Sequence, residues 1–244
     1  MQEFTALDGA LLIDKPSGLT SHDVVDEIRR EFQIKKVGHC GTLDPAATGL
    51  LIIVLGRGTK LSEKLMSDDK VYAGTIKFGE STDSYDADGE LTASLPVPPL
   101  TVEELNQAAI QYTGDQMQMP PMVSAVKKGG VPLYKLARKG IEVAREPRLI
   151  HIYNFKFSAY QEPIGTFTLA CTKGTYVRSI AHDLGQKLGC GAHLASLRRT
   201  VSGKFEVANA IELDAALKLS PAQLEQRVIP YLKLAAGLTT PPPP

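Results

Sequence analysis

Residues 38–55 read GHCGTLDPAATGLLIIVL, and two kinds of structure meet within them. Residues 50–55 are apolar without interruption, which predicts a strand buried on both faces. The preceding residues 35–49 are rich in Gly and Thr and show no helical period, so most of them are expected to form an ordered loop. Asp44 lies in this loop directly before Pro45. An Asp-Pro pair commonly begins a turn, and this ordinary interpretation stands beside a chemical role for the carboxylate.

Outside this stretch, strands and helices are intermingled along the chain. Apolar runs and period-two alternation predict strands at residues 10–13, 71–78, 148–157, 167–171 and 193–205. Apolar residues at helical spacing predict helices at residues 21–32, 59–66, 101–112, 132–139, 177–188, 213–217 and 221–226. The order lacks the regular alternation of a doubly wound fold. We therefore expect an α+β architecture with a mixed, mostly antiparallel central sheet flanked by helices.

The pattern also predicts three local features. Ser21 is expected to cap the first helix, because serine side chains accept hydrogen bonds from the N–H groups of a helix start. Tyr153, Phe155 and Phe157 are expected on one face of their strand, since side chains alternate along a strand. Residues 79–89 are polar and are expected to form a surface loop.

The composition is that of an ordinary globular protein. Of the 244 residues, 43% are hydrophobic and 22% are charged, which is enough material for a sizeable core. We expect one domain over residues 1–229. Residues 230–244 end in four prolines and are expected to be a disordered tail.

Cysteine usage and charge bound the class of protein further. Cys40, Cys171 and Cys190 are far apart, which argues against a disulfide framework or a zinc site and suits a reducing compartment. No secretory leader and no apolar run of membrane-spanning length is evident, so a cytoplasmic protein is expected. The formal net charge of zero counts against nucleic-acid binding unless the cations cluster.

Several stretches that follow one another in order over residues 10–205 together resemble the TruB-type tRNA pseudouridine synthases. Residues 38–51 are similar to the catalytic motif of that family, and LIDKPSGLTS at residues 12–21 is similar to its first motif. Further matches lie at residues 70–72, 79–89, 120–127 and 174–179. The resemblance implies the pseudouridine-synthase fold.

The resemblance also implies a reaction, the isomerisation of the T-loop uridine of tRNA (position 55) to pseudouridine without cofactor or metal. The base must leave the folded tRNA elbow and enter a pocket. Asp44 is then the catalytic carboxylate, Arg178 the arginine that pairs with it, and Tyr72 the tyrosine that stacks on the base. Whether Asp44 attacks the ribose, attacks the ring or stabilises charge stays open.

Five further residues are candidates for contact with the substrate RNA. The resemblance implies that His39 fills space near the flipped nucleotide and that Leu197 lines the pocket. Asp86 and Lys127 lie in matched stretches and are further candidates. Lys15 either supports its own loop or touches the RNA backbone. Ordinary packing remains an alternative for His39 and Leu197.

Clustered cations are expected to bind tRNA phosphates despite the zero net charge, because folded RNA is read largely by its shape and backbone. The enzyme is expected to act on the T-arm and elbow of tRNA, as a monomer that needs no protein partner. The cations form three groups along the chain: Arg29, Arg30, Lys35 and Lys36; Lys127, Lys128, Lys135, Arg138 and Lys139; and Lys173, Arg198, Arg199 and Lys204.

Three other functions fit parts of the sequence. A guide-RNA-dependent synthase of the same superfamily normally carries an additional C-terminal domain, for which the roughly 35 residues after the last matched strand are too few. A non-catalytic RNA-binding module or tRNA folding chaperone would predict a broken set of catalytic residues. A metal-dependent hydrolase would use Asp83, Asp86 and Asp88, but no His lies at ligand spacing and solvated turn acids explain them better.

Overall fold

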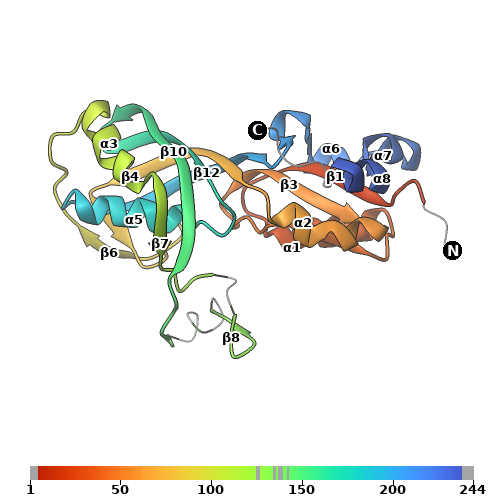
Figure 1. Cartoon of the computed structure of the whole chain (residues 1–244), viewed down its shortest axis with the longest axis horizontal. Coiled ribbons are helices and arrows are strands. Elements are labelled where there is room, and N and C mark those ends of the chain that lie inside the picture. Colours follow the sequence, from red (N-terminus) through yellow and green to blue (C-terminus); the bar gives the residue numbers. More distant parts are fainter. Residues whose placement is uncertain (1–4, 125–126, 134–135, 137–139, 142, 238–244) are drawn as a thin grey trace. The chain divides into compact units, whose positions relative to one another are not determined.

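The computed structural model describes residues 5–124, 127–133, 136, 140–141 and 143–237, which form two compact units (Figure 1). Unit 1 contains the residues up to Lys70 and those from Arg198 onward, and unit 2 contains Val71–Leu197. The chain passes from one unit to the other within two strands, β4 (Lys70–Phe78) and β12 (Ala192–Ser202). The single domain expected over residues 1–229 stays a prediction.

Unit 1 is built on a sheet whose central strand is the apolar run identified in the sequence. The strands follow the order β14 (Ile211–Glu212), β1 (Gly9–Lys15), β3 (Thr48–Leu55) and β12, with β2 (Val37–Cys40) beside β3, β13 (Phe205–Glu206) beside β12 and β15 (Ile229–Pro230) beside β1. All residues of β3 after Thr48 are buried, so the predicted burial on both faces is confirmed. The expected loop over residues 35–49 is shorter than predicted, because Val37–Cys40 pairs with β3.

Helices cover the sheet of unit 1, and their bounds are α1 (Ser21–Glu31), η1 (Gly56–Leu61), α2 (Ser62–Met66), η3 (Val207–Asn209), α6 (Leu213–Ala216), α7 (Pro221–Arg227) and α8 (Tyr231–Gly237). The prediction that Ser21 caps α1 is wrong. Thr20 caps it instead, in a reciprocal pair of hydrogen bonds with Asp23. Ser21 is the first helical residue, and its side chain bonds elsewhere.

The segment after residue 229 was expected to be disordered, and this is wrong for residues 230–237. They form the end of β15 and helix α8, because Leu234 is fully buried in an apolar cluster with residues of β1, β3 and α2. Burial of one leucine side chain is worth about 1.5–3 kcal/mol, which favours the ordered helix. Residues 238–244 lie outside the described residues.

Unit 2 contains a second run of strands. Its order is β12, β4, β11 (Ile164–Cys171), β10 (Arg148–Gln161) and β7 (Gly114–Gln118), with two short hairpins formed by β5 (Glu80–Thr82) with β6 (Leu91–Ser94) and by β8 (Lys127–Lys128) with β9 (Val131–Pro132). Helices α3 (Val102–Ala109) and α5 (Val177–Lys187) and the short η2 (Ile110–Tyr112) complete the unit. Apolar residues of α3 and α5 share one core with those of β4, β10 and β11.

One predicted face of β10 is wrong. Phe155 and Phe157 are buried, whereas Tyr153 is 51% exposed. The pairing of β10 with β11 shifts register between Ile152 and Asn154, so the alternation of side chains is interrupted there.

The predicted fold class is confirmed. Strands β1–β14 and β3–β12 pair in parallel, while β1–β3, β2–β3, β10–β11 and β7–β10 pair antiparallel. Most of the predicted basic helix at residues 132–139 lies outside the described residues.

Candidate active site

Asp44 lies in the loop between β2 and β3, in unit 1. The loop turns at this residue, because the carbonyl of Asp44 accepts a hydrogen bond from the N–H of Ala47 at 3.1 Å. The Asp44 side chain is half-buried. The turn expected of an Asp-Pro pair is therefore present at Asp44.

Lys15, at the end of β1, holds this loop from one side. Its Nζ donates to the carbonyl oxygens of Pro16 and Leu19 at 2.7 Å each and of Pro45 at 3.0 Å. The side chain is 0% exposed. Burial lowers the pKa of Lys15 to about 8, and the negative charge of Asp44 acts against this shift. The ammonium group is thus enclosed by protein carbonyls, which favours the loop-supporting alternative for Lys15 over a contact with RNA.

Two further residues of the first motif bind the same loop. The Oγ of Ser21 accepts from the N–H of Leu43 at 2.8 Å and donates to the carbonyl of the same residue at 3.1 Å. The N–H of Gly18 donates to the carbonyl of Pro45 at 2.9 Å. The residues on both sides of Asp44 are therefore tied to residues 15–21, which explains physically why the two motifs occur together.

Arg199 holds the ends of the loop. Its Nε donates to the carbonyl of Leu50 at 2.8 Å, and its Nη2 donates to that of Gly41 at 3.1 Å. The expected role of Arg199 as a phosphate-binding cation is wrong, because the side chain is only 1% exposed. The backbone of Arg199 also approaches Gly49 so closely that a Cβ there would lie 2.3 Å from its carbonyl oxygen, and Gly49 has φ +99°. Only glycine fits this approach.

Replacing Lys15 with methionine is expected to destabilise the protein and slow any reaction that depends on Asp44. Three partly buried carbonyls lose their charged donor, and a hydrogen bond to a charged group is worth about 1.5–3 kcal/mol. We expect the free energy of unfolding to fall by about 3 kcal/mol in denaturant titrations. Lys60→Met, which removes an exposed lysine of the same unit, should change it by under about 0.5 kcal/mol. Equal stabilities of the two variants would contradict this role for Lys15.

His39 lies on β2, in the same unit as Asp44. Burial lowers the pKa of His39, and the positive charge of Arg199 lowers it further. Among the described residues its buried Nδ1 has no hydrogen-bond partner. A neutral, largely desolvated imidazole suits the expected space-filling role, and contact with RNA stays a prediction.

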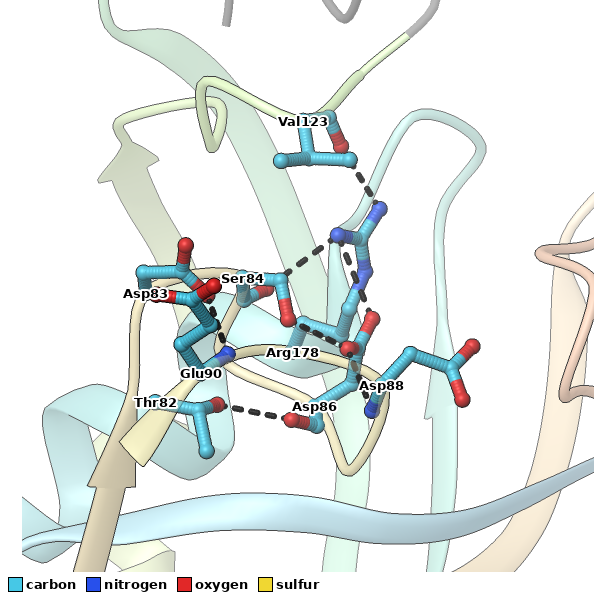
Figure 2. A network of polar contacts seen from close by, with 8 residues as sticks. All are labelled: Thr82, Asp83, Ser84, Asp86, Asp88, Glu90, Val123 and Arg178. Carbon is cyan, nitrogen blue, oxygen red and sulfur yellow. Dashed lines mark hydrogen bonds and ion pairs between the residues drawn. The ribbon is translucent and has the colours of Figure 1, made fainter. Parts of the chain in front are cut away.

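In unit 2, Arg178 is the centre of a polar network (Figure 2). It projects from the first turn of α5 and is 4% exposed. Its Nη1 donates to the carbonyl of Ser84 at 3.2 Å and lies 3.5 Å from the carboxylate of Asp86, while its Nη2 donates to the carbonyl of Val123 at 2.9 Å. The predicted partnership of Arg178 with Asp44 stays a prediction.

Asp86 has a defined place in this network. Its carboxylate accepts from the Oγ of Ser84 at 2.5 Å and from the N–H of Asp88 at 3.2 Å, besides its ion pair with Arg178 (Figure 2). The carboxylate of Asp83 accepts from the N–H of Glu90. Within the described residues, no cluster of His, Cys, Asp and Glu fits a metal ion. These bonds support the structural explanation of the acidic loop over a hydrolase site.

Tyr72 and Leu197 occupy neighbouring strands of unit 2. Tyr72 lies on β4 and Leu197 on β12, and both are half-buried and pack against the core that α5 covers. Each therefore combines a packed side with some accessible surface, as expected for a pocket wall and equally for a core residue.

The predicted cationic groups divide into accessible and occupied side chains. Arg30, Lys35, Lys36, Lys173 and Lys204 are exposed. Arg198 instead binds Asp14 with both terminal nitrogens, at 2.9 and 2.5 Å. The side chains of Lys127 and Lys128 and the whole of Lys135, Arg138 and Lys139 lie outside the described part of the chain.

Comparison with known proteins agrees with the resemblance. The family model described as TruB family pseudouridylate synthase (N terminal domain) matches residues 29–177, and the model described as tRNA pseudouridylate synthase B C-terminal domain matches residues 178–232. The chain belongs to the TruB family. The resemblance found in the sequence ended near residue 205, whereas the match extends to residue 232, so the C-terminal segment also follows the family pattern.

Individual TruB relatives cover nearly the whole chain. The tRNA pseudouridine synthase B of Opitutus terrae is 55% identical over 232 residues, which are 95% of this chain and 96% of that protein. The enzyme of the same name from Syntrophotalea carbinolica is 46% identical over 95% of this chain and 75% of its own length. A solved chain described as "Crystal Structure of a Cbf5-Nop10-Gar1 Complex" has a TM-score of 0.74 at 26% identity, over 93% of this chain and 61% of that one.

Several contacts in the site of this TruB protein were not predicted from the sequence. Ser84 and Val123 bind Arg178 through backbone carbonyls, which leave no signal in residue types. Ser21 was interpreted as a helix cap, although its place in the first motif could have linked it to the Asp44 loop. Arg199 follows Arg198 in a basic strand, and strand alternation could have placed one of these two side chains in the interior.

Proposed function

We propose that this chain converts the T-loop uridine of tRNA, at position 55, into pseudouridine. In the reaction the bond between N1 of the base and C1′ of the ribose breaks, the base turns, and C5 bonds to C1′. The proton of C5 is lost and N1 gains one, so the product is an isomer of the substrate. No redox partner and no second substrate is required.

The hydrogen bonds that hold the Asp44 loop are the observation that supports this proposal most. A carboxylate beside the base can attack the ribose or the ring, or stabilise the charge that develops as the glycosidic bond breaks. Such a role requires a fixed position, since small displacements of a reacting group cost large factors in rate. Lys15, Ser21 and Arg199 supply that fixation through hydrogen bonds from buried side chains to the loop backbone. Family membership supports the uridine substrate.

Family membership suggests the roles of the remaining site residues. Tyr72 stacks on the flipped base and helps to remove the proton of C5, and Leu197 provides an apolar wall. Arg178 supplies positive charge that keeps the catalytic carboxylate ionised, and Asp86 orients Arg178. His39 packs near the flipped nucleotide. Lys15 acts through the loop and not through RNA.

The proposal extends to binding and location. Exposed cations of unit 1, among them Arg30, Lys35 and Lys36, and Lys127 in unit 2 contact the phosphates of the T-arm. The enzyme acts as a monomer in the cytoplasm, where tRNA is processed. Among the described residues, no helix is long and apolar enough to cross a bilayer. A guide-RNA-dependent activity is less well supported, because relatives that match 95% of this chain are named tRNA pseudouridine synthase B.

The test is tritium release from an elongator tRNA transcript labelled at C5 of its uridines. We expect one equivalent of tritium per tRNA, at the same rate with or without EDTA, because the proposed chemistry uses only side chains. Binding of tRNA without tritium release would favour an RNA-binding module or folding chaperone. Loss of release in EDTA that added Mg²⁺ restores, with tRNA folding checked separately, would contradict the metal-free reaction.

A further inference from the structure

We propose that the stacked rings of Tyr85 and His182 form a positioning pair that fixes the Asp86 carboxylate against Arg178. The inference rests on the proposed function only in one respect, namely that Arg178 takes part in the reaction. All four residues lie in unit 2, on α5 and on the loop between β5 and β6.

The backbone of the loop is unusual at Tyr85. Its φ is +66°, and among the described residues only Gln33 shares a positive φ without being glycine. A bulky side chain rarely adopts this left-handed conformation, and it persists where the surroundings fix it. Tyr85 directly precedes Asp86, so the direction of the Asp86 side chain depends on this conformation.

The ring of Tyr85 has a partner that can fix it. It stacks on the imidazole of His182 with 3.9 Å between ring centroids and 17° between ring planes. His182 follows Arg178 by four residues on α5, so both side chains leave the helix on the same side. The helix therefore contacts the loop twice, through Arg178 at Asp86 and through His182 at the neighbouring residue.

Backbone hydrogen bonds hold residues 85–87 of this loop against β12. The N–H of Leu194 donates to the carbonyl of Tyr85 at 2.9 Å, and the N–H of Ala87 donates to the carbonyl of Leu194 at 3.0 Å. These bonds fix the backbone on both sides of Asp86, so the direction of its side chain depends mainly on the backbone dihedral angles at Tyr85. The stack of the Tyr85 ring on His182 restrains these angles.

The chemistry of His182 suits stacking better than proton transfer. Burial lowers the pKa of His182, and the charge of Asp183 acts in the opposite direction. Its Nδ1 is buried and, among the described residues, has no hydrogen-bond partner. A neutral ring on the face of a tyrosine contributes contact area and orientation.

The experiment compares His182→Ala and Tyr85→Gly, which remove a ring, with His182→Phe, which keeps one. Gln186→Ala, at an exposed position of the same helix, is the matched control. Single-turnover tritium release, tRNA affinity and denaturant unfolding are measured for each. Tyr85→Gly also removes the conformational strain, so it keeps the test informative if His182→Ala does not fold.

We expect both ring-removing variants to react about 10-fold to 100-fold more slowly, with tRNA affinity within about 2-fold of wild type. His182→Phe should recover most of the rate, and Gln186→Ala should match wild type. Adding His182→Ala to Asp86→Asn should slow the reaction no further than Asp86→Asn alone, since both act through one carboxylate.

Full rates for His182→Ala and Tyr85→Gly, or additive losses with Asp86→Asn, would overturn the inference. The unfolding data give an independent measure, because coupling between His182 and Asp86 in a double-mutant cycle does not depend on activity. If wild type releases no tritium yet this coupling is present, the proposed function fails and the positioning pair stands. If the coupling is absent, the pair fails whatever the activity.

Discussion

Asp44→Asn is expected to lower the rate of tritium release by about 10⁴-fold, the size of loss typical for a group that acts directly in the chemistry. The asparagine side chain has nearly the same shape, so the bonds of Lys15, Ser21 and Arg199 to the loop backbone remain. Affinity for tRNA and the free energy of unfolding should therefore change little. Tritium release under single-turnover conditions, filter binding and denaturant titration measure the three quantities.

Two further variants test whether the position and the charge of this carboxylate matter. Asp44→Glu keeps the charge but adds a methylene group, and a displacement of this size is expected to cost at least about 10²-fold in rate. Asp26→Asn removes a surface carboxylate of α1 and should react like wild type. An active Asp44→Asn enzyme would assign the chemistry to another residue.

Arg178→Met is expected to reduce both stability and rate. It leaves the Asp86 carboxylate without its cation and the carbonyls of Ser84 and Val123 without a donor. Removal of one partner of a buried ion pair costs about 3–5 kcal/mol, and loss of a preorganised charge costs about 10²–10³-fold in rate. Denaturant titration and single-turnover tritium release measure the two effects.

A double variant separates catalysis from folding. Arg178→Met with Asp86→Leu removes both charges, so much of the lost stability should return. The rate should remain low, because the guanidinium group is still absent. Recovery of the rate together with the stability would show that Arg178 only supports the fold. Arg178→Lys keeps the charge but lacks the planar guanidinium fork that reaches Ser84, Val123 and Asp86, and we expect an intermediate rate.

The sequence predicted the elements of this protein well where one physical signal decided each of them. The uninterrupted apolar residues 50–55 predicted a buried strand, and the stripe of Val177, Ile180 and Leu184 predicted a buried helix face. The failures have local causes. Thr20 caps α1 because Asp23 lies three residues later and completes the reciprocal pair of hydrogen bonds. A register shift in β10 leaves the Tyr153 side chain exposed.

The candidate site was predictable in its residue types but not in its contacts. Clustered charge suggested Arg198 and Arg199 as groups for RNA, and Lys15 had an RNA contact as one of two alternatives, yet all three bind protein atoms. The reason is that a cation can bind carbonyl or carboxylate oxygens of its own protein, and the sequence does not show which of these oxygens the fold brings beside it. Likewise, nothing in the sequence showed that Tyr85 would stack on a histidine of α5, almost a hundred residues later.

The most direct test is a positional map of pseudouridine in an elongator tRNA transcript, made by carbodiimide derivatisation and primer extension. After incubation with the wild-type chain, we predict a single new stop at the T-loop uridine, and none after incubation with Asp44→Asn. A stop at another uridine would contradict the proposed substrate. The same stop with both proteins would contradict the role of Asp44, and no stop with a folded wild-type chain that binds the tRNA would contradict the proposed activity.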